Sequence, residues 1–476
     1  MPRDLKPFFA PRSVAIVGAS ERPTSSGGAV LQMLRKSGYP GRIAPINPKG
    51  GTAFGLTMHP SLQAAGPPAE LCVIVIRPDQ VLDAVREAVA AGHRNFLILP
   101  GGFAEAGEAG KARDAELQAL IKAHGLTVAG PNCAGIIHLP EGHRFGATFL
   151  RDLPPGGGTA FISQSGALAE EVIASANAMQ IGVGTIVSVG NATQLGIEDY
   201  LEFLGTDPRC TAVLLYVESI EGPDRFRRIA RTVAAEKPVV FLMGGATAPG
   251  ARAATAHTGA IANTDAAIDA FAAEACMVRV KSLRRCLIAA KGFARYPQGI
   301  GRRILLLSNS GGPGVLATDR AHDEGLDIVD LPAEMAAALR AALPPEASVA
   351  NPLDLLADAR EDRFGLTLES AIKFGVGRFD AILGIHVVPF MVDPNPIVAR
   401  LAELAKTVPI PMLHSMMGTL PGKAEWFASM ERAGVPTFND VEEMCECAGL
   451  LAQYPRLKAE AAKPLPNRPP ALRGRT

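Results

Sequence analysis

The sequence lacks features that would point to several classes of protein. It has no excess charge, because Lys and Arg together number 47 and Asp and Glu also number 47. This balance argues against nucleic acid or an anionic membrane as partner, so any bound anion must be held by local loops. It also has no CxxC pair among its seven scattered cysteines. They therefore predict neither a disulfide framework nor a zinc site, and they are typical of a reducing compartment.

Long hydrophobic runs are missing as well. The first residues, MPRDLKPFFAPRS, contain no apolar core of a signal peptide, and no apolar run reaches membrane-spanning length. Hydrophobic residues make up 48% of the chain and charged residues 20%, which is typical of a soluble globular protein. We therefore expect a cytoplasmic protein with no metal site, no nucleic-acid partner and no membrane partner.

What the sequence does contain is a repeated alternation of short β-branched runs and helical stretches. With 476 residues the chain is too long for one ordinary core, and about three domains are expected. Continuous apolar runs between helical segments predict parallel strands that are covered on both faces. We predict an α/β protein with three doubly wound parallel-sheet domains. They are expected at residues 1–135, 136–297 and 298–457, followed by a Pro-rich, disordered or loosely docked tail at 458–476.

A glycine-rich turn follows the first predicted strand. The segment GASERPTSSGG, residues 18–28, leads into a helix, and such a turn offers backbone N–H groups and a helix N-terminus to phosphate. The GxGxxG spacing of NAD-binding proteins is absent. The next strand ends in INPKG, where Lys49 replaces the acid that would bind a ribose and suits a phosphate-rich nucleotide. The alternative is a set of turn glycines beside a solvated Lys49.

Two further strand-to-helix turns repeat this arrangement. In AFISQSGAL the strand ends at Ser163, and Ser165 can cap a helix over residues 167–176 whose first N–H groups would face an anion. SNSGGPG, residues 308–314, is a third copy. Three such turns indicate phosphate handling, although a plain N-cap is the alternative for each serine.

His257 lies in AATAHTGAIANTD, residues 253–265, among side chains too small to pack around an imidazole. The small residues allow close approach and motion, so we expect a flexible segment. Glu218, at the end of the predicted strand LLYVES, is the best candidate for a partner carboxylate. By accepting a hydrogen bond from one ring nitrogen of His257, Glu218 would fix the tautomer of the imidazole and leave the other nitrogen nucleophilic. The N–H groups after Ser165 would then stabilise a phosphoryl group on that second nitrogen. A structural or exposed histidine is the alternative.

Together these stretches resemble one family. From about Ser13 to Tyr454 the chain is similar to the α subunit of NDP-forming acyl-CoA synthetases, the ADP-forming acetate–CoA ligase type related to succinyl-CoA synthetase. The resemblance is carried by SVAIVGAS, INPKG, GGFAEAG, AGPNCAGI, AFISQSGAL, VSVGN, LLYVESI, GARAATAHTGAIA and SNSGGPGVLA. It implies a Rossmann-like CoA-binding domain, then a succinyl-CoA-synthetase-like flavodoxin domain that carries the His257 loop, then a second flavodoxin-like domain.

The resemblance also implies functional residues. His257 is expected to be transiently phosphorylated, with Glu218 as its supporting carboxylate. The helix start that would cradle the phosphoryl group consists of Ser163, Gln164, Ser165 and Gly166. Contacts to coenzyme A are expected from turns of the first domain, at Gly18, Ala19, Ser20, Lys49, Arg77, Pro78, Gly101, Gly102, Asn132 and Cys133. We expect the Cys133 thiol to be structural, because no base is evident near it in the sequence.

Three positions depart from the family's pattern. Met243 stands where relatives commonly carry a lysine, and VSVGN is followed by Ala192 instead of an acid. These two changes leave the nucleotide and acyl specificity open. Arg77 replaces a small apolar residue, and it either contacts a CoA phosphate or is solvated.

The family's ATP-grasp domain has no counterpart in the sequence, because the three α/β units account for every segment. The expected partner is a separate ATP-grasp β subunit in a hetero-oligomer, which would bind ATP or ADP with Mg²⁺. The expected reaction converts a carboxylic acid, CoA and ATP to acyl-CoA, ADP and phosphate through an acyl phosphate and phosphohistidine. The alternatives are a non-catalytic CoA-binding regulatory or scaffold protein, and a dinucleotide-dependent oxidoreductase, against which the missing GxGxxG argues.

Overall fold

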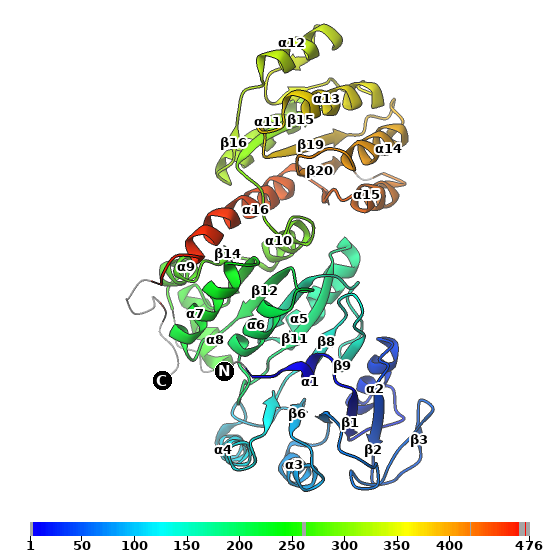
Figure 1. Cartoon of the computed structure of the whole chain (residues 1–476), viewed down its shortest axis with the longest axis vertical. Coiled ribbons are helices and arrows are strands. Elements are labelled where there is room, and N and C mark those ends of the chain that lie inside the picture. Colours follow the sequence, from blue (N-terminus) through cyan, green and yellow to red (C-terminus); the bar gives the residue numbers. More distant parts are fainter. Residues whose placement is uncertain (1–2, 259–262, 419, 466–471, 473–476) are drawn as a thin grey trace. The chain divides into compact units, whose positions relative to one another are not determined.

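The computed structural model describes residues 3–258, 263–418, 420–465 and 472, without the side chains of residues 254–258. Three mostly parallel sheets with intervening helices build the described chain (Figure 1). The chain divides into two compact units, Met1–Ala290 with Lys458–Thr476, and Lys291–Leu457. The first two sheets belong to the first unit and the third sheet to the second. The predicted α/β fold with parallel sheets is confirmed.

The first sheet is parallel, with the strand order β2-β1-β5-β6-β7. Its strands are β1 (Ser13–Val17), β2 (Arg42–Ile46), β5 (Leu71–Ile74), β6 (Asn95–Ile98) and β7 (Thr127–Ala129). The helices α2 (Ser26–Lys36), α3 (Val81–Ala90) and α4 (Gly107–His124) connect them, and β3 (Thr52–Ala53) and β4 (Leu56–Thr57) form a small hairpin. After their first residues the strands are mostly apolar and buried, as expected for parallel strands covered by helices, and all four residues of β5 are buried.

The second sheet has the order β14-β13-β12-β10-β11-β8-β9. Its strands are β8 (Gly135–His138), β9 (Phe145–Thr148), β10 (Thr159–Ser163), β11 (Val183–Ser188), β12 (Ala212–Val217), β13 (Val239–Met243) and β14 (Val278–Val280). Its helices are α1 (Lys6–Phe9), α5 (Gly166–Met179), α6 (Ile197–Thr206), α7 (Pro223–Ala234), α8 (Ala248–Thr258), α9 (Asp265–Glu274) and α10 (Leu283–Arg295). At one side of this sheet, β8 runs antiparallel to both of its neighbours, β11 and the edge strand β9, which the sequence did not predict. Residues 139–144 join β8 to β9 as a hairpin in place of a crossover helix.

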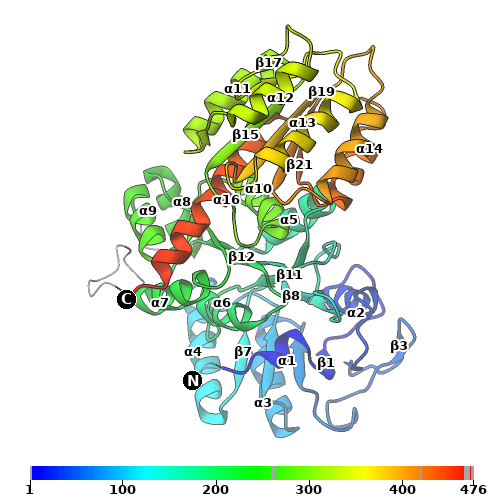
Figure 2. The same cartoon turned by 45° about the horizontal axis from the view of Figure 1, so that its top comes forward.

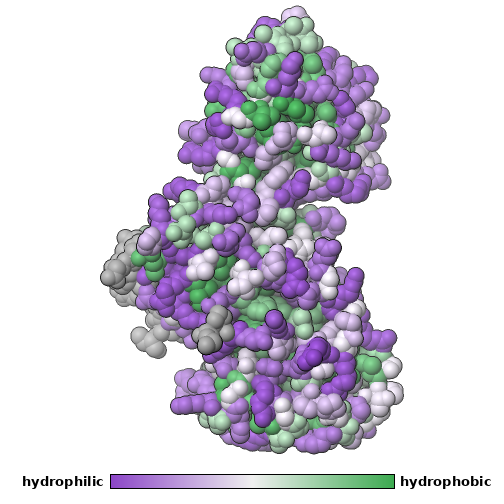
Figure 3. All heavy atoms as spheres, viewed as in Figure 1, coloured by the Kyte–Doolittle hydropathy of each residue, from purple (hydrophilic) through white to green (hydrophobic). Residues whose placement is uncertain are grey.

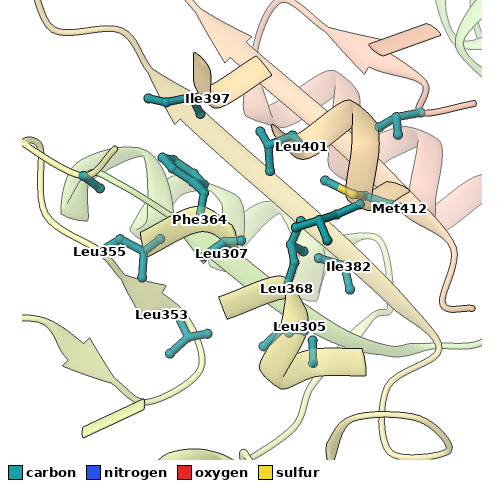
Figure 4. Packing of buried hydrophobic residues seen from close by; sticks show 14 of the residues in the cluster. Leu305, Leu307, Leu353, Leu355, Phe364, Leu368, Ile382, Ile397, Leu401 and Met412 are labelled. Carbon is teal, nitrogen blue, oxygen red and sulfur yellow. The ribbon is translucent and has the colours of Figure 1, made fainter. Parts of the chain in front are cut away.

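The third sheet has the order β17-β18-β15-β19-β20-β21, with β16 paired to β15. Its strands are β15 (Arg303–Ser308), β16 (Asp327–Ile328), β17 (Ser348–Val349), β18 (Leu353–Asp354), β19 (Ala381–Val387), β20 (Met412–Met417) and β21 (Thr437–Phe438). Its helices are α11 (Gly311–Asp323), α12 (Ala333–Ala342), α13 (Glu361–Phe374), α14 (Pro394–Ala405), α15 (Lys423–Arg432) and α16 (Val441–Ala461). In its core, Leu305, Ile382 and Met412 from the strands pack with Leu368 of α13 and Leu401 of α14 (Figure 4).

The last helix, α16, is drawn in red in Figure 2. It runs past residue 457, so the predicted Pro-rich tail begins inside a helix. The buried Arg231 of α7 holds the end of this helix, because its guanidinium donates to the carbonyl oxygens of Glu460 at 2.6 Å and Lys463 at 2.9 Å. The described part of the tail is therefore docked.

The described surface gives no sign of a membrane span. No helix within the described residues is both long and apolar enough to cross a bilayer. The face shown in Figure 3 is mostly hydrophilic, with smaller apolar patches between the polar residues.

Candidate functional site

The residues predicted to contact coenzyme A lie at one edge of the first sheet. Parallel sheets bind ligands outside the carboxyl ends of their strands. Gly18, Ala19 and Ser20 follow β1, Lys49 follows β2, Arg77 and Pro78 follow β5, Gly101 and Gly102 follow β6, and Asn132 and Cys133 follow β7. The topology thus brings segments that are far apart in the sequence to the same carboxyl edge.

The turn after β1 differs in detail from the prediction. The N–H groups of Gly18 and Ala19 both donate to the carbonyl oxygen of Ile46, at 3.1 and 3.2 Å. They are committed to the sheet and are not directed at a ligand. The helix α2 starts only at Ser26, where the Ser25 hydroxyl caps it by accepting from the N–H of Gly28 at 3.2 Å. A backbone anion site in this turn would therefore have to use residues after Ala19.

Two basic side chains lie at the same edge and are exposed. The N–H of Lys49 donates to the side chain of Asn47 at 3.0 Å, and the Asn47 amide donates to the carbonyl oxygen of Ala19 at 2.8 Å. Asn47 thus fixes the Lys49 turn against the first turn and leaves the Lys49 ammonium group exposed. Arg77 is paired with Asp79, with 2.6 Å between Nη2 and Oδ2. It is therefore already engaged by an acid.

The turn after β6 is closed by a carboxylate that the sequence analysis missed. Glu105 accepts from the N–H groups of Gly102 and Phe103 and from the side-chain amide of Asn191. Burial opposes the charge of Glu105, but these hydrogen bonds outweigh it and hold the pKa of Glu105 below its usual value. Asn191 also accepts from the Asn132 amide at 3.1 Å. The sequence signals for this network were three separate motifs, GGFAEAG with Glu105, AGPNCAGI with Asn132 and VSVGN with Asn191, but nothing in the sequence showed that these residues pair.

The Cys133 thiol points into the first domain. It is buried and donates to the carbonyl oxygen of Ile98 at 3.4 Å. Burial raises the pKa of Cys133 to about 12, so the thiol stays protonated and is not a nucleophile at neutral pH. The next residue, Ala134, donates its N–H to the Ser188 hydroxyl at 2.9 Å, and a Cβ on Gly166 would lie 3.2 Å from the Ala134 side chain. The end of the first sheet therefore lies against the start of α5.

The predicted phosphate turn has the expected strand–turn–helix form. The helix α5 begins at Gly166, and Ser165 is its N-cap, with its hydroxyl accepting from the N–H of Leu168 at 3.4 Å. The Ser163 hydroxyl accepts from the N–H of Ser165 at 3.0 Å and donates to its carbonyl oxygen at 2.8 Å. These bonds hold the turn in one shape, and the predicted helix and N-cap are confirmed.

Gln164 has a different environment from the one predicted. Its side-chain oxygen accepts from the N–H groups of Glu218, at 2.6 Å, and Ser219, at 3.0 Å. Its side-chain nitrogen donates to the carbonyl oxygen of Ser219 at 3.0 Å. The amide is thus directed at protein backbone and not at an anion. Glu218 itself is buried at the end of β12, and its carboxylate accepts from the Tyr216 hydroxyl at 3.3 Å.

His257 lies in α8, whereas the sequence analysis expected a flexible segment. The helix was not predicted, although alanine, the commonest residue here, has the highest helix propensity; that the segment is flexible stays a prediction. The side chain of His257 and the whole of residues 259–262 are outside the described part of the chain. The predicted contact between His257 and Glu218 therefore stays a prediction.

The third turn repeats the hydrogen bonds of the second. The Ser308 hydroxyl accepts from the N–H of Ser310 at 3.0 Å and donates to its carbonyl oxygen at 2.8 Å. The Asn309 amide bonds to both the N–H and the carbonyl of Val387, at 2.9 and 2.8 Å. Valine thus occupies the place that Glu218 has in the second sheet. Among the described residues, no group of three or more His, Cys, Asp or Glu side chains could hold a metal ion.

Comparisons with known proteins cover nearly the whole chain. Three family models match successive segments: a CoA binding domain at residues 12–139, a succinyl-CoA ligase like flavodoxin domain at 156–293, and a ligase-CoA domain at 304–427. The solved dinucleotide forming acetyl-coenzyme A synthetase 1 of Ca. Korarchaeum cryptofilum, in complex with phosphate and ADP, is 29% identical with a TM-score of 0.91. The match covers 98% of this chain and 100% of that one.

Two curated relatives extend the comparison. Trans-feruloyl-CoA synthase, from an unknown prokaryotic organism, is 34% identical over 74% of this chain, which spans only 50% of that protein's length. The α subunit of ADP-forming acetate–CoA ligase II from Pyrococcus furiosus is 31% identical over 452 residues, covering 94% of this chain and 97% of that subunit. With this similarity over almost its full length, the chain belongs to the family of NDP-forming acyl-CoA synthetases, to which the ADP-forming acetate–CoA ligase α subunits also belong.

Proposed function

We propose that this chain is the CoA-binding, phosphohistidine subunit of an ADP-forming acyl-CoA synthetase. The observation that carries the proposal is the placement of Glu218 at the end of β12. The neighbouring strand β10 leads directly into the capped helix α5, so the carboxylate and the helix start lie at the same end of adjacent strands. A buried carboxylate and the free N–H groups of a helix start are the two features that phosphoryl transfer to a histidine would need.

Coenzyme A would bind at the carboxyl edge of the first sheet. The exposed ammonium group of Lys49 would pair with a phosphate, and the segment after β7 would lead the thiol end toward α5. Residues 130–134 support this path, because they run from the end of the first sheet to the start of that helix. Arg77 would join the phosphate contacts only if its pair with Asp79 opened.

The reaction would proceed through an acyl phosphate. Phosphate attacks the acyl carbon of acyl-CoA, the C–S bond breaks, and CoA leaves. One imidazole nitrogen of His257 then attacks phosphorus, the bond to the acyl oxygen breaks, and the carboxylate leaves. Glu218 would accept a hydrogen bond from the other ring nitrogen and stabilise the positive charge that develops on the ring.

The remaining step would need a partner. A separate ATP-grasp β subunit would bind ADP with Mg²⁺ and take the phosphoryl group from His257. Run in reverse, the same steps make acyl-CoA from an acid, CoA and ATP. The acid is open, because the two curated relatives are named for acids as different as acetate and ferulate.

The proposal is tested by labelling the chain without any nucleotide. Incubation with radiolabelled phosphate and either acetyl-CoA or feruloyl-CoA should place an acid-labile, base-stable label on His257. The His257→Ala chain should take up no label yet bind CoA as before, because the imidazole reacts and does not hold CoA. Label on Ser165, or label that survives in His257→Ala, would show that the proposed mechanism is wrong.

A further inference from the structure

We infer that Gln164 and Tyr216 are positioning residues for Glu218, one fixing its main chain and the other its carboxylate. The inference rests on the proposed function, in which Glu218 supports the phosphorylated histidine. It assigns to Gln164 a role other than phosphate binding, and it gives Tyr216 a role that no motif suggested.

Gln164 extends the sheet beyond its last paired residues. The strands β10 and β12 are parallel, and their register ends with Ser163 opposite Tyr216. The N–H of Gln164 still donates to the carbonyl oxygen of Tyr216, at 3.2 Å. Its side-chain amide then makes the three bonds to Glu218 and Ser219 that a further strand residue would otherwise supply. The main chain of Glu218 is therefore held rigidly just where it leaves the sheet.

Tyr216 acts on the other end of Glu218. Residues two apart on a strand point to the same face, so the Tyr216 ring lies beside the Glu218 side chain. Its hydroxyl donates to Oε1 at 3.3 Å. Burial raises the pKa of Tyr216 to about 12, and the nearby Glu218 charge adds to the shift, so the phenol keeps its proton at neutral pH.

Gly244 leaves room for this phenol. It follows β13, and its N–H donates to the carbonyl oxygen of Val217 at 2.9 Å. A Cβ at this position would lie 2.9 Å from the Tyr216 hydroxyl oxygen, which is closer than real Cβ contacts. The tyrosine, the glycine and the glutamine therefore form one arrangement around Glu218.

The test measures the initial rate of His257 labelling in the full chain, with acetyl-CoA or feruloyl-CoA and labelled phosphate. Gln164→Ala should slow labelling by about tenfold, because three bonds to the Glu218 turn are lost. Tyr216→Phe should slow it by about threefold to tenfold through the loss of one hydrogen bond. Affinity for CoA, measured by calorimetry, should stay within about twofold of the original chain in both variants.

A double-mutant cycle separates positioning from a general loss of structure. If Gln164 acts through Glu218, then Gln164→Ala added to Glu218→Gln should slow labelling by less than about twofold more. Gln164→Glu keeps both acceptor bonds to N–H groups, so it should restore part of the rate and covers the case in which Gln164→Ala folds poorly.

Gln194→Ala is the matched control in the same unit. The Gln194 amide also bonds only to backbone, accepting from the N–H of Val128 at 2.7 Å and donating to the carbonyl oxygen of Leu126 at 2.9 Å. This variant should label within about twofold of the original chain. Equal slowing in Gln194→Ala, full multiplicativity in the cycle, or a normal rate in Gln164→Ala would overturn the inference. Absence of any label on the original chain would instead contradict the proposed function, on which the inference depends.

Discussion

Lys49 is an exposed lysine at the carboxyl edge of the first sheet, and Asn47 fixes its main chain there. A charge-assisted contact with a phosphate is worth about 1.5–3 kcal/mol, and a reversed charge adds repulsion. We therefore expect Lys49→Glu to weaken CoA binding by more than about tenfold, as measured by calorimetry.

The control for Lys49→Glu is another exposed lysine, Lys122, in the last turn of α4. The last turn of α4 leads into the amino end of β7, whereas Lys49 lies at the carboxyl ends of the strands. Lys122→Glu should therefore leave the affinity for CoA unchanged. Equal affinities for CoA in the original and the Lys49→Glu chains would show that the CoA phosphates do not contact Lys49 at this edge.

The residue-scale predictions succeeded where the cause is local. Ser165 was predicted as an N-cap because a cap depends only on residues within one turn, and the structure confirms it. The environment of Gln164 could not be predicted, because it depends on which strand lies beside β10. That strand, β12, lies about fifty residues away in the sequence, with α5, β11 and α6 between. The same reason hides the pairing of Glu105 with Asn191.

At the scale of elements, β19 and β20 carry two histidines into the apolar core of the third sheet. His386 and His414 are both fully buried, and their ring centroids lie 6.2 Å apart. Neither ring nitrogen of either residue has a hydrogen-bond partner among the described residues. Burial lowers the pKa of His386 to about 4 and that of His414 to about 3, with a smaller contribution to His414 from His386.

These two strands should make the second unit sensitive to acid. Both rings stay neutral in the folded unit but accept protons near pH 6.5 once unfolded, so the unfolded state binds more protons below that pH. The contribution of the two neutral rings to the stability of the second unit is fully present above about pH 6.5. It is lost as the pH falls toward their pKa values in the folded unit, about 4 and about 3. Each ring should lower the free energy of unfolding by up to about 1.4 kcal/mol for every pH unit in that interval.

One side chain makes this effect measurable. The chain has a single tryptophan, Trp426, which lies in α15 of the second unit and donates to the Asn395 side chain at 2.8 Å. Denaturant unfolding followed by its fluorescence therefore reports the second unit alone. His386→Gln should make the free energy of unfolding of the second unit less dependent on pH. His322→Gln, at an exposed position in α11, should leave that dependence unchanged. Identical slopes in the original and His386→Gln chains would contradict the role of burial.

Elements were predictable from the sequence where burial decides them. Apolar runs such as those of β5 and β10 are buried along their whole length, and the sequence pattern alone identified them as parallel strands. The α8 segment was missed because small residues were taken to indicate motion, while alanine also favours a helix. The hairpin of β8 and β9 was missed because its two short strands are defined by pairing, β8 with β11 and β9 with β8, and not by a long apolar run.

At the scale of the whole molecule, the three family models match residues 12–139, 156–293 and 304–427, and each of the three large sheets lies mostly within one of them. We therefore expect the purified chain to form no ADP from ATP, acid and CoA by itself. ADP formation, followed by a coupled assay, should appear when an ATP-grasp β subunit is added. A His257→Ala chain with the same β subunit should stay inactive. ADP formation by a chain shown by mass spectrometry to be free of any partner would contradict this division of labour.

The side-chain amide that holds Glu218 has a counterpart in the third sheet, where Asn309 holds Val387. Each amide bonds only to main chain, Gln164 to that of Glu218 and Ser219 and Asn309 to that of Val387, so these bonds do not depend on the side chain carried by Glu218 or Val387. A carboxylate in one copy and a valine in the other are thus compatible with the same local architecture. The amide-held turn therefore does not by itself determine whether the residue beside it brings a charged or an apolar side chain to the carboxyl end of the sheet.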